Sequence, residues 1–168
     1  MMSDTRKRTN SVGRVVQTLQ RLGMPADVVE FDESTRSSAE AAAAIGCEVA
    51  QIAKSIVFRG KQSGRCILVI ASGADRIDEK KLRTEIGEGV SRADADFVRE
   101  RTGFAIGGVA PVGHVGEVCV LVDRRLWDMD PIWAAAGAPN AVFRLSADDL
   151  HRIPDIRVVD VRQVPVSA

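Results

Sequence analysis

The chain has 168 residues, of which 45% are hydrophobic and 27% charged, as in a globular domain that buries one sizeable core. Its formal net charge at pH 7 is zero, which argues against an extended basic face for DNA and leaves room for a small basic patch. No apolar run approaches the roughly 20 residues of a membrane helix, and residues 1–10 are basic, unlike the apolar core of a signal peptide. We therefore expect a cytoplasmic protein with neither a membrane nor a DNA partner.

The cysteines and histidines lack the spacing of a metal site. Cys47, Cys66 and Cys119 are far apart in apolar surroundings, which is typical of reduced core thiols. The two histidines are His114 and His151. The sequence also contains no P-loop and no dinucleotide-binding fingerprint. It predicts no metal and no cofactor.

Residues 1–10 are predicted to be a flexible terminus, and residues 11–168 to form one domain. Apolar residues recur at helical spacing over 12–22, and Ser37 with Glu40 forms a capping-box pattern before an alanine-rich helix. Two runs rich in β-branched residues flank a glycine-containing turn, which predicts a hairpin. The elements expected in this half are helices over 12–22 and 38–45, a helical turn over 48–52, and strands over 28–31, 54–59 and 66–71.

The second half has further helix starts. Asp78 is a predicted N-cap, Ser91 with Asp94 three residues later opens another helix, and Asp130 with Pro131 is an N-cap and first-turn pair. Helices are expected over 79–86, 91–102 and 131–136 and briefly after 146, with strands over 118–122, 141–145 and 156–161. Because strands and helices mix without regular βαβ alternation, we predict a single α+β (mixed α/β) domain, with a central mixed β-sheet flanked by helices.

Residues 103–114 form an unusual loop that contains four glycines, Pro111 and His114 but no acidic or basic side chain. Glycine permits positive φ and a close approach of the main chain to another molecule, and so apolar a loop is hard to explain as a solvent-facing linker. One interpretation is a wall whose amides face a ligand. The other is a tight structural turn between a helix and a strand, and the loop by itself leaves both open.

Lys54 leads an apolar strand face. If the predicted strand alternates, Lys54 shares its face with Ile52, Ile56 and Phe58. A lysine in this position either reaches solvent or meets a negative group. The first role is structural. The second places an ammonium at a pocket wall, where it could hold a phosphate or stabilise a developing oxyanion.

Other candidate groups have ordinary structural explanations. A histidine placed like His114 is more often a hydrogen-bonded structural residue than a general base. A thiol hydrolase built from Cys47, His114 and Asp123 has no support in their spacing. The segment 72–75 follows a strand, where ligand loops often lie, but the same residues also form ordinary turns.

Three segments together resemble a known family. They are residues 42–47 (AAAIGC), 52–58 (IAKSIVF) and 102–114 (TGFAIGGVAPVGH). Their order is that of the YbaK-like aminoacyl-tRNA deacylases, a superfamily that includes the editing domain of bacterial prolyl-tRNA synthetases, and the similarity runs from about Phe31 to about Leu150. The resemblance implies a central mixed sheet flanked by helices, and hydrolysis of the ester that joins a wrong amino acid to the tRNA 3′ end.

The resemblance also assigns individual residues. Lys54 matches the family's functional lysine, and Gly107 and Pro111 match the ends of its G-x-x-x-P loop, so Lys54 and Gly107 are the expected catalytic residues. The expected substrate contacts are Phe31, Ser37, Ile56, Ser72, Gly108, Pro111, Val112, Gly113, His114 and Gly137. Prolyl-synthetase editing domains usually show a histidine after a late glycine-alanine turn, whereas residues 137–143 (GAPNAVF) contain none. The amino-acid specificity therefore stays open.

The predicted function is trans-editing. An aminoacyl ester is activated, so its hydrolysis needs a positioned water, oxyanion donors and a sorting pocket rather than a full nucleophilic triad. The expected substrate is the 3′ CCA end of a mischarged tRNA, tRNA(Pro) by the resemblance, carrying a small or thiol-bearing amino acid. An aminoacyl-tRNA synthetase is the other expected partner. The alternatives are a non-catalytic tRNA- or synthetase-binding module with the same fold, and a hydrolase of another small ester or a nucleotide-binding protein that uses the same cleft.

Overall fold

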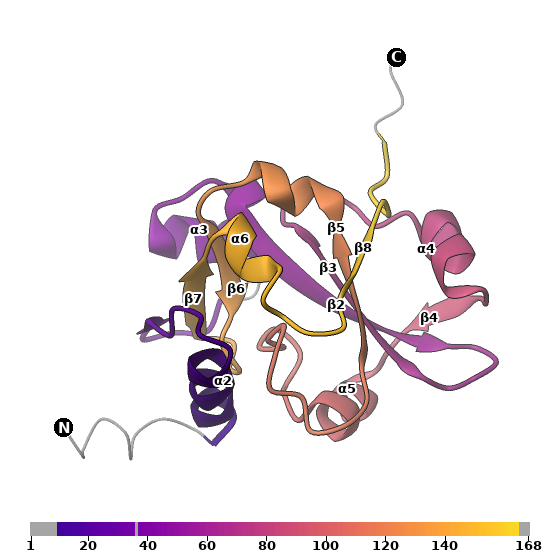
Figure 1. The fold of residues 1–168 in the computed structure, drawn as a ribbon, viewed down its shortest axis with the longest axis horizontal. Coiled ribbons are helices and arrows are strands. Elements are labelled where there is room, and N and C mark those ends of the chain that lie inside the picture. Colours follow the sequence, from indigo (N-terminus) through magenta and orange to yellow (C-terminus); the bar gives the residue numbers. More distant parts are fainter. Residues whose placement is uncertain (1–9, 36, 165–168) are drawn as a thin grey trace.

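The computed structural model describes residues 10–35 and 37–164, and within them eight strands form one mixed sheet (Figure 1). The strands are β1 Val28–Glu30, β2 Ile52–Gly60, β3 Cys66–Ser72, β4 Val90–Arg92, β5 Cys119–Asp123, β6 Ile132–Ala135, β7 Ala141–Leu145 and β8 Arg157–Val159. Seven of them follow the order β1-β7-β6-β2-β3-β5-β8, and β4 pairs with β2 beside that path. Because β2 is antiparallel to β3 and parallel to β6, the predicted mixed sheet is confirmed.

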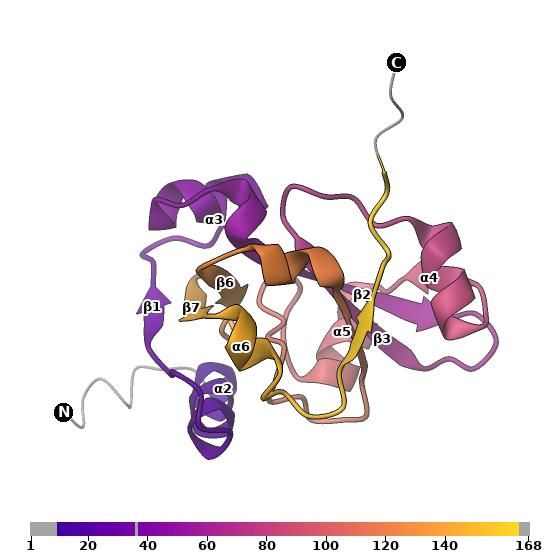
Figure 2. The same ribbon diagram turned by 45° about the horizontal axis from the view of Figure 1, so that its top comes forward.

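Helices flank this sheet. They are α2 Asn10–Arg21, α3 Ser38–Ile45, α4 Glu79–Ile86, α5 Ala95–Thr102 and α6 Ala147–Leu150, with 3₁₀ turns η1 Val49–Gln51 and η2 Arg124–Asp128. Figure 2 shows α3 and α2 on opposite sides of β6 and β7. Within residues 10–35 and 37–164, no helix is long and apolar enough to cross a bilayer.

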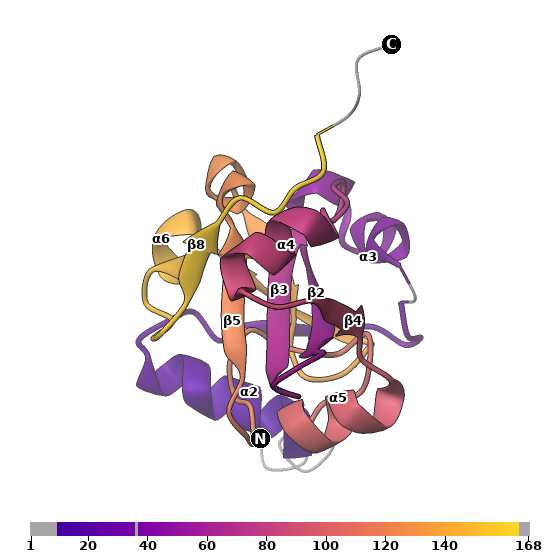
Figure 3. The ribbon, with the colours of Figure 1, turned by 90° about the vertical axis from the view of Figure 1, so that its right-hand side faces the viewer.

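The strand β3 separates two cores because its buried side chains alternate. Leu68 and Ile70 pack with residues of α2 and α5, whereas Ile67 and Val69 pack with residues of α4. Burial of each such side chain contributes about 1.5–3 kcal/mol. The alternation therefore fixes α4 on one face and α2 and α5 on the other, and Figure 3 shows α4 at the top and the other two helices at the bottom.

The predicted caps of α3 and α4 are confirmed. The Ser37 hydroxyl accepts a hydrogen bond from the Glu40 amide at 3.1 Å, and Gly46 ends α3 at φ 85°. Asp78 caps α4 through the amides of Lys80 and Lys81. The two N-caps satisfy main-chain amides that have no partner inside the helix, and the Gly46 amide donates to the Ala42 oxygen at the other end of α3.

Two of the predicted helix starts are wrong. Residues 132–135 form the strand β6 instead of a helix, because Ile132 and Ala134 are buried and the strand pairs with both β2 and β7. Ser91 lies in β4 opposite Arg59, and α5 begins later, with Asp94 as its N-cap. Sheet pairing thus outweighs the local helix signals in both places.

The predicted flexible terminus falls mostly on residues 1–9, which lie outside the described residues, and Asn10 already begins α2. The predicted single domain over 11–168 therefore keeps a helix at its start. Residues 165–168 also lie outside the described residues, so the predicted domain boundaries stay a prediction.

Gly13 offers a stability test of α2. It lies inside the helix at a non-positive φ, and an added Cβ would have no neighbour within 4 Å. We expect Gly13→Ala to raise the free energy of unfolding by about 0.5–1 kcal/mol in urea titrations, because alanine loses less backbone entropy. The control Gly137→Ala should lower it, because Gly137 has φ 101° and its Cβ would lie 2.8 Å from the Ser11 oxygen. A destabilised Gly13→Ala variant would contradict a helical, open environment at this position.

Candidate functional site

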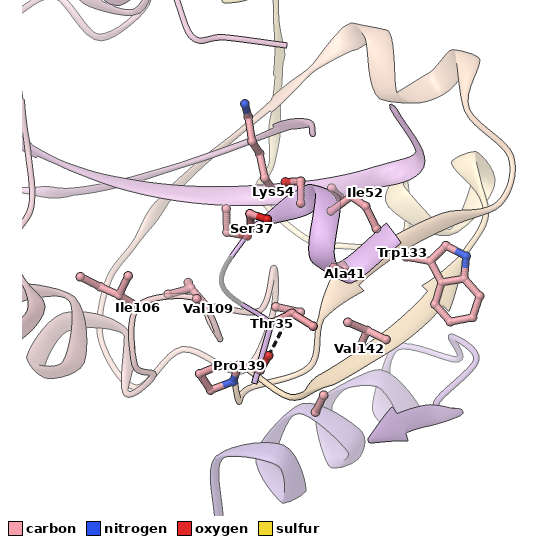
Figure 4. A pocket seen from close by; sticks show the side chains of 17 residues that line it. Thr35, Ser37, Ala41, Ile52, Lys54, Ile106, Val109, Trp133, Pro139 and Val142 are labelled. Atoms are coloured by element: carbon pink, nitrogen blue, oxygen red, sulfur yellow. Dashed lines mark hydrogen bonds between the residues drawn. The ribbon is translucent and has the colours of Figure 1, made fainter. Parts of the chain in front are cut away.

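A cavity of about 260 Å³ lies where α3, β2, β6 and the glycine-rich loop meet (Figure 4). Its lining is mostly apolar, with a few hydroxyl groups from the start of α3 and the segment before it. The lining residues are Thr35, Ser37, Ser38, Ala41, Ile52, Ala53, Lys54, Ser55, Ile106, Gly107, Val109, Trp133, Ala134, Ala135, Pro139, Ala141 and Val142.

The cavity lies beside an interruption in the sheet. On the side of β2 away from β3, β6 pairs with Ile52 and Ala53, and β4 pairs with residues 58–60. Among the described strands none pairs with the stretch from Lys54 to Val57 on that side. This leaves room for a hollow next to the middle of β2, with the start of α3 at its rim.

The glycine-rich loop contributes main chain to the cavity wall. Gly107 lines it at φ 88°, between Ile106 and Val109. Gly108 lies against the 137–139 turn so closely that a Cβ would lie 2.7 Å from the Ala138 main chain. Other loop side chains, including Phe104, are buried in the core. The loop is therefore both a cavity wall and a structural turn, since its edge at Gly107 faces the cavity and its other residues pack into the core.

Lys54 also lines the cavity, but its ammonium does not face the loop. The side chain is half-buried, and its Nζ donates a hydrogen bond to the main-chain oxygen of Asp75. Figure 4 shows the nitrogen pointing away from Ile106, Val109 and Pro139. Lys54 and the loop are thus brought to one cavity, with the charged group on its outer side.

The surroundings of Lys54 affect its charge. Burial lowers the pKa of Lys54, the charge of Asp75 opposes this effect, and the charges of Arg92 and Arg76 add to it. The Asp75 carboxylate forms an ion pair with Arg125 at 2.8 Å. The ammonium therefore lies among more positive than negative groups, a setting that favours an anionic ligand.

Of the predicted contact residues, Ser37 lines the cavity, and its hydroxyl already caps α3. Several others do not line it. Phe31 borders a separate surface hollow with Glu33 and Glu40, and Ile56 packs against the core under α4. The Ser72 hydroxyl is buried and donates to the Ala50 oxygen at 2.8 Å.

The remaining predicted contacts hold the glycine-rich loop and its neighbours in place. Pro111 and Val112 are buried. The Gly113 oxygen accepts a hydrogen bond from Arg14 Nε at 3.3 Å, and Gly137 lies against α2. These residues support the cavity wall from behind, as does Gly108.

His114 has a structural position. Its Nε2 donates to the Ala110 oxygen at 2.7 Å, and its ring meets the Phe104 ring edge-on at 6.0 Å between centroids. Burial lowers the pKa of His114, and the positive charge of Arg14 adds to this, against the Ala110 hydrogen bond. The neutral imidazole thus ties the loop to the core.

A pH dependence of stability follows from His114. Because its folded pKa is lowered, the unfolded chain binds a proton first as the pH falls, so stability is full above about pH 6.5 and declines below it. We expect the free energy of unfolding to fall between pH 7.5 and 5.5 more steeply in the wild type than in His114→Asn, by at most about 1.4 kcal/mol per pH unit. Equal pH dependence of the two proteins in urea titrations would contradict the buried neutral histidine.

The thiol-hydrolase arrangement is absent. The Asp123 carboxylate accepts hydrogen bonds from the Val161 and Arg125 amides, at 2.9 and 3.1 Å. Burial raises the pKa of the Cys66 thiol to about 11, and burial likewise raises that of Cys47. Among the described residues, no three His, Cys, Asp or Glu side chains cluster as metal ligands.

Sequence reasoning missed much of the cavity lining. Trp133 and Ala134 fell in the segment predicted as a helix, although the alternation from Ile132 was a strand signal. Thr35 donates to the Pro139 oxygen through both its amide and its hydroxyl, each at 3.1 Å. No local pattern in the sequence predicts that contact.

Comparisons with known proteins agree with this geometry. A family model described as an aminoacyl-tRNA editing domain matches residues 32–153. The uncharacterized protein YwhH of Bacillus subtilis (strain 168) is 36% identical over 136 residues, which cover 80% of this chain and 86% of YwhH. Proline–tRNA ligase of Limosilactobacillus fermentum is 32% identical over 94 residues, or 54% of this chain and 16% of the ligase.

A crystal structure of a protein proposed as a trans-editing enzyme for prolyl tRNA synthetase has a TM-score of 0.85 and 39% identity. The match covers 94% of this chain and all of that one. The family match spans more than half of the chain, and the similarity to YwhH spans most of both proteins. The chain therefore belongs to the aminoacyl-tRNA editing domain family.

Proposed function

We propose that this protein hydrolyses the ester bond between a small, wrongly attached amino acid and the 3′ end of a tRNA. The observation that carries the proposal is that the main chain of Gly107 and the side chain of Lys54 line the same cavity. The named relatives, a proline–tRNA ligase and a proposed trans-editing enzyme for prolyl tRNA synthetase, favour tRNA(Pro) as the carrier. Translation takes place in the cytoplasm, which is the proposed location.

The cavity is suited to a small acyl group. Its apolar walls include Ile52, Ala134 and Val142, and a volume of about 260 Å³ leaves room for a short side chain and the ester. Such a pocket excludes side chains that are too large but discriminates only weakly among those that fit, since one methylene is worth only about 1–3 kcal/mol in a hydrophobic site. Alanine, cysteine and serine are therefore the proposed candidates for the amino acid.

The chemistry needs few side chains. In the proposed complex, the main-chain amide of Gly107 stabilises the tetrahedral oxyanion, and the ribose hydroxyl of the substrate assists proton transfer to and from a bound water. Lys54 lies at the outer rim, where its ammonium holds the nucleotide end of the substrate. If the ammonium moved from the Asp75 carbonyl to a phosphate oxygen, it would exchange a neutral hydrogen-bond acceptor for a charged one.

A panel of tRNAs charged with alanine, cysteine, serine or proline tests the proposal. Release of alanine, cysteine or serine would support it, provided that the ester on tRNA(Pro) is cleaved faster than on other tRNAs and correctly charged prolyl-tRNA is left intact. Binding without release would instead support a non-catalytic tRNA-binding module. Absence of both would contradict any role on aminoacyl-tRNA.

A further inference from the structure

Two arginines lie near Lys54. Arg92 lies opposite Phe58 in the pairing of β4 with β2, so it shares the face on which Lys54, Ile56 and Phe58 alternate. Its guanidinium lies over the Phe58 ring, 5.9 Å from the centroid. Arg76 directly follows Asp75, whose carbonyl accepts the Lys54 hydrogen bond. Both arginines thus lie close enough to Lys54 to affect its charge, although neither lines the cavity itself.

These arginines are exposed and, among the residues that the structure describes, neither forms an ion pair. The nearby Asp75 carboxylate is largely buried and forms its ion pair with Arg125. Both arginine charges reach Lys54, because each contributes to lowering its pKa, although less than burial does. In a chain of zero net charge, this is a local concentration of positive charge.

We propose that Arg76 and Arg92 bind phosphate groups of the single-stranded tRNA 3′ end, next to Lys54. This inference rests on the proposed function and assigns the nucleotide side of the same site. A guanidinium matches two phosphate oxygens at once, and it can do so while it remains over an aromatic ring, as that of Arg92 lies over Phe58. The acyl group would occupy the cavity while the phosphates lie along its outer rim, where the Lys54 ammonium already points.

The test measures binding of a deacylated acceptor minihelix with a CCA end, as a function of KCl concentration. Arg76→Gln and Arg92→Gln should each weaken binding and reduce the slope of log K against log salt by about 0.7, the value for one lost phosphate contact on a single strand. The double variant should lose about twice that slope. Arg92→Lys should keep it, because the charge remains.

Arg99→Gln is the matched control, an exposed arginine on α5 that packs against the opposite face of the sheet. Its slope should equal that of the wild type. An unchanged slope in the double variant, or an equal loss in the control, would overturn the phosphate site. So would inorganic phosphate binding as tightly as the minihelix, since the site would then take the free ion.

A second arm separates this inference from the proposed function. Aminoacyl-adenosine without a phosphate should be hydrolysed equally by the wild type and the double variant, whereas hydrolysis of the charged minihelix should fall through a higher KM in the variant. If no ester is hydrolysed by any of these proteins, the proposed function fails. The salt slopes would still decide whether the arginines hold phosphate.

Discussion

The Lys54→Ala variant is expected to lose about 10- to 100-fold in kcat/KM for deacylation, because one charge-assisted contact to the substrate is worth about 1.5–3 kcal/mol. The physical reason is the position of the ammonium at the rim of the cavity, half-buried and surrounded by more positive than negative charge. In the proposed complex, the variant would lack the cation that holds the negatively charged end of the substrate. Initial rates with aminoacylated tRNA(Pro) would measure the loss.

Two controls make the Lys54 result specific. Lys54→Arg keeps the charge and should retain part of the activity, and Lys61→Ala removes an exposed lysine from the β2–β3 turn and should retain all of it. Lys54 makes one hydrogen bond, to the Asp75 oxygen, so its removal should cost only about 0.5–1.5 kcal/mol of unfolding free energy. Turnover at the wild-type rate by Lys54→Ala would remove this residue from the mechanism.

Gly107→Val is expected to reduce deacylation by about 100-fold, as for a displacement of the reacting groups by about 1 Å. Gly107 lines the cavity with main chain at φ 88°, a conformation that a β-branched residue rarely adopts. The nearest atom to an added Cβ is Pro139 Cβ at 3.7 Å, so the larger part of a valine side chain would take space in the cavity. Kinetics with the same charged tRNA, together with urea unfolding, would measure both effects.

The matched control for this variant is Gly87→Val. Gly87 ends α4 at φ 87°, and its added Cβ would meet nothing within 4 Å. Both variants should therefore lose a similar stability, about 1–2 kcal/mol from the left-handed backbone, but only Gly107→Val should lose activity. If both variants lost activity equally, or if Gly107→Val kept normal kinetics, the loop would not form part of the site.

Local signals in the sequence carried much of the fold. Ser37, Gly46 and Asp78 act as the caps that their residue types predict, because capping depends on a few neighbouring residues. The hairpin of β2 and β3 follows from two β-branched runs and the turn between them. The helix predicted over 131–136 rests on the local pair Asp130 and Pro131, whereas the strand that forms there depends on pairing with β2 and β7, of which β2 is distant in sequence.

The site was only partly predictable, for a similar reason. Lys54 and Gly107 were identified from their motifs, and both line the cavity. The direction of the ammonium depends on the Asp75 carbonyl, which is 21 residues away, and no pattern around Lys54 shows it. His114 and Gly113 lie in the same conspicuous loop, yet their hydrogen bonds to Ala110 and Arg14 place them behind the wall.

The most direct measurement is a crystal structure with adenosine that carries alanine through a non-hydrolysable 3′-amide. We predict the alanyl group in the cavity against Gly107, and the 5′ side of the adenosine directed toward Lys54. An analogue bound elsewhere on the protein, with the cavity unoccupied at saturating concentration, would contradict the assignment of this cavity as the editing site.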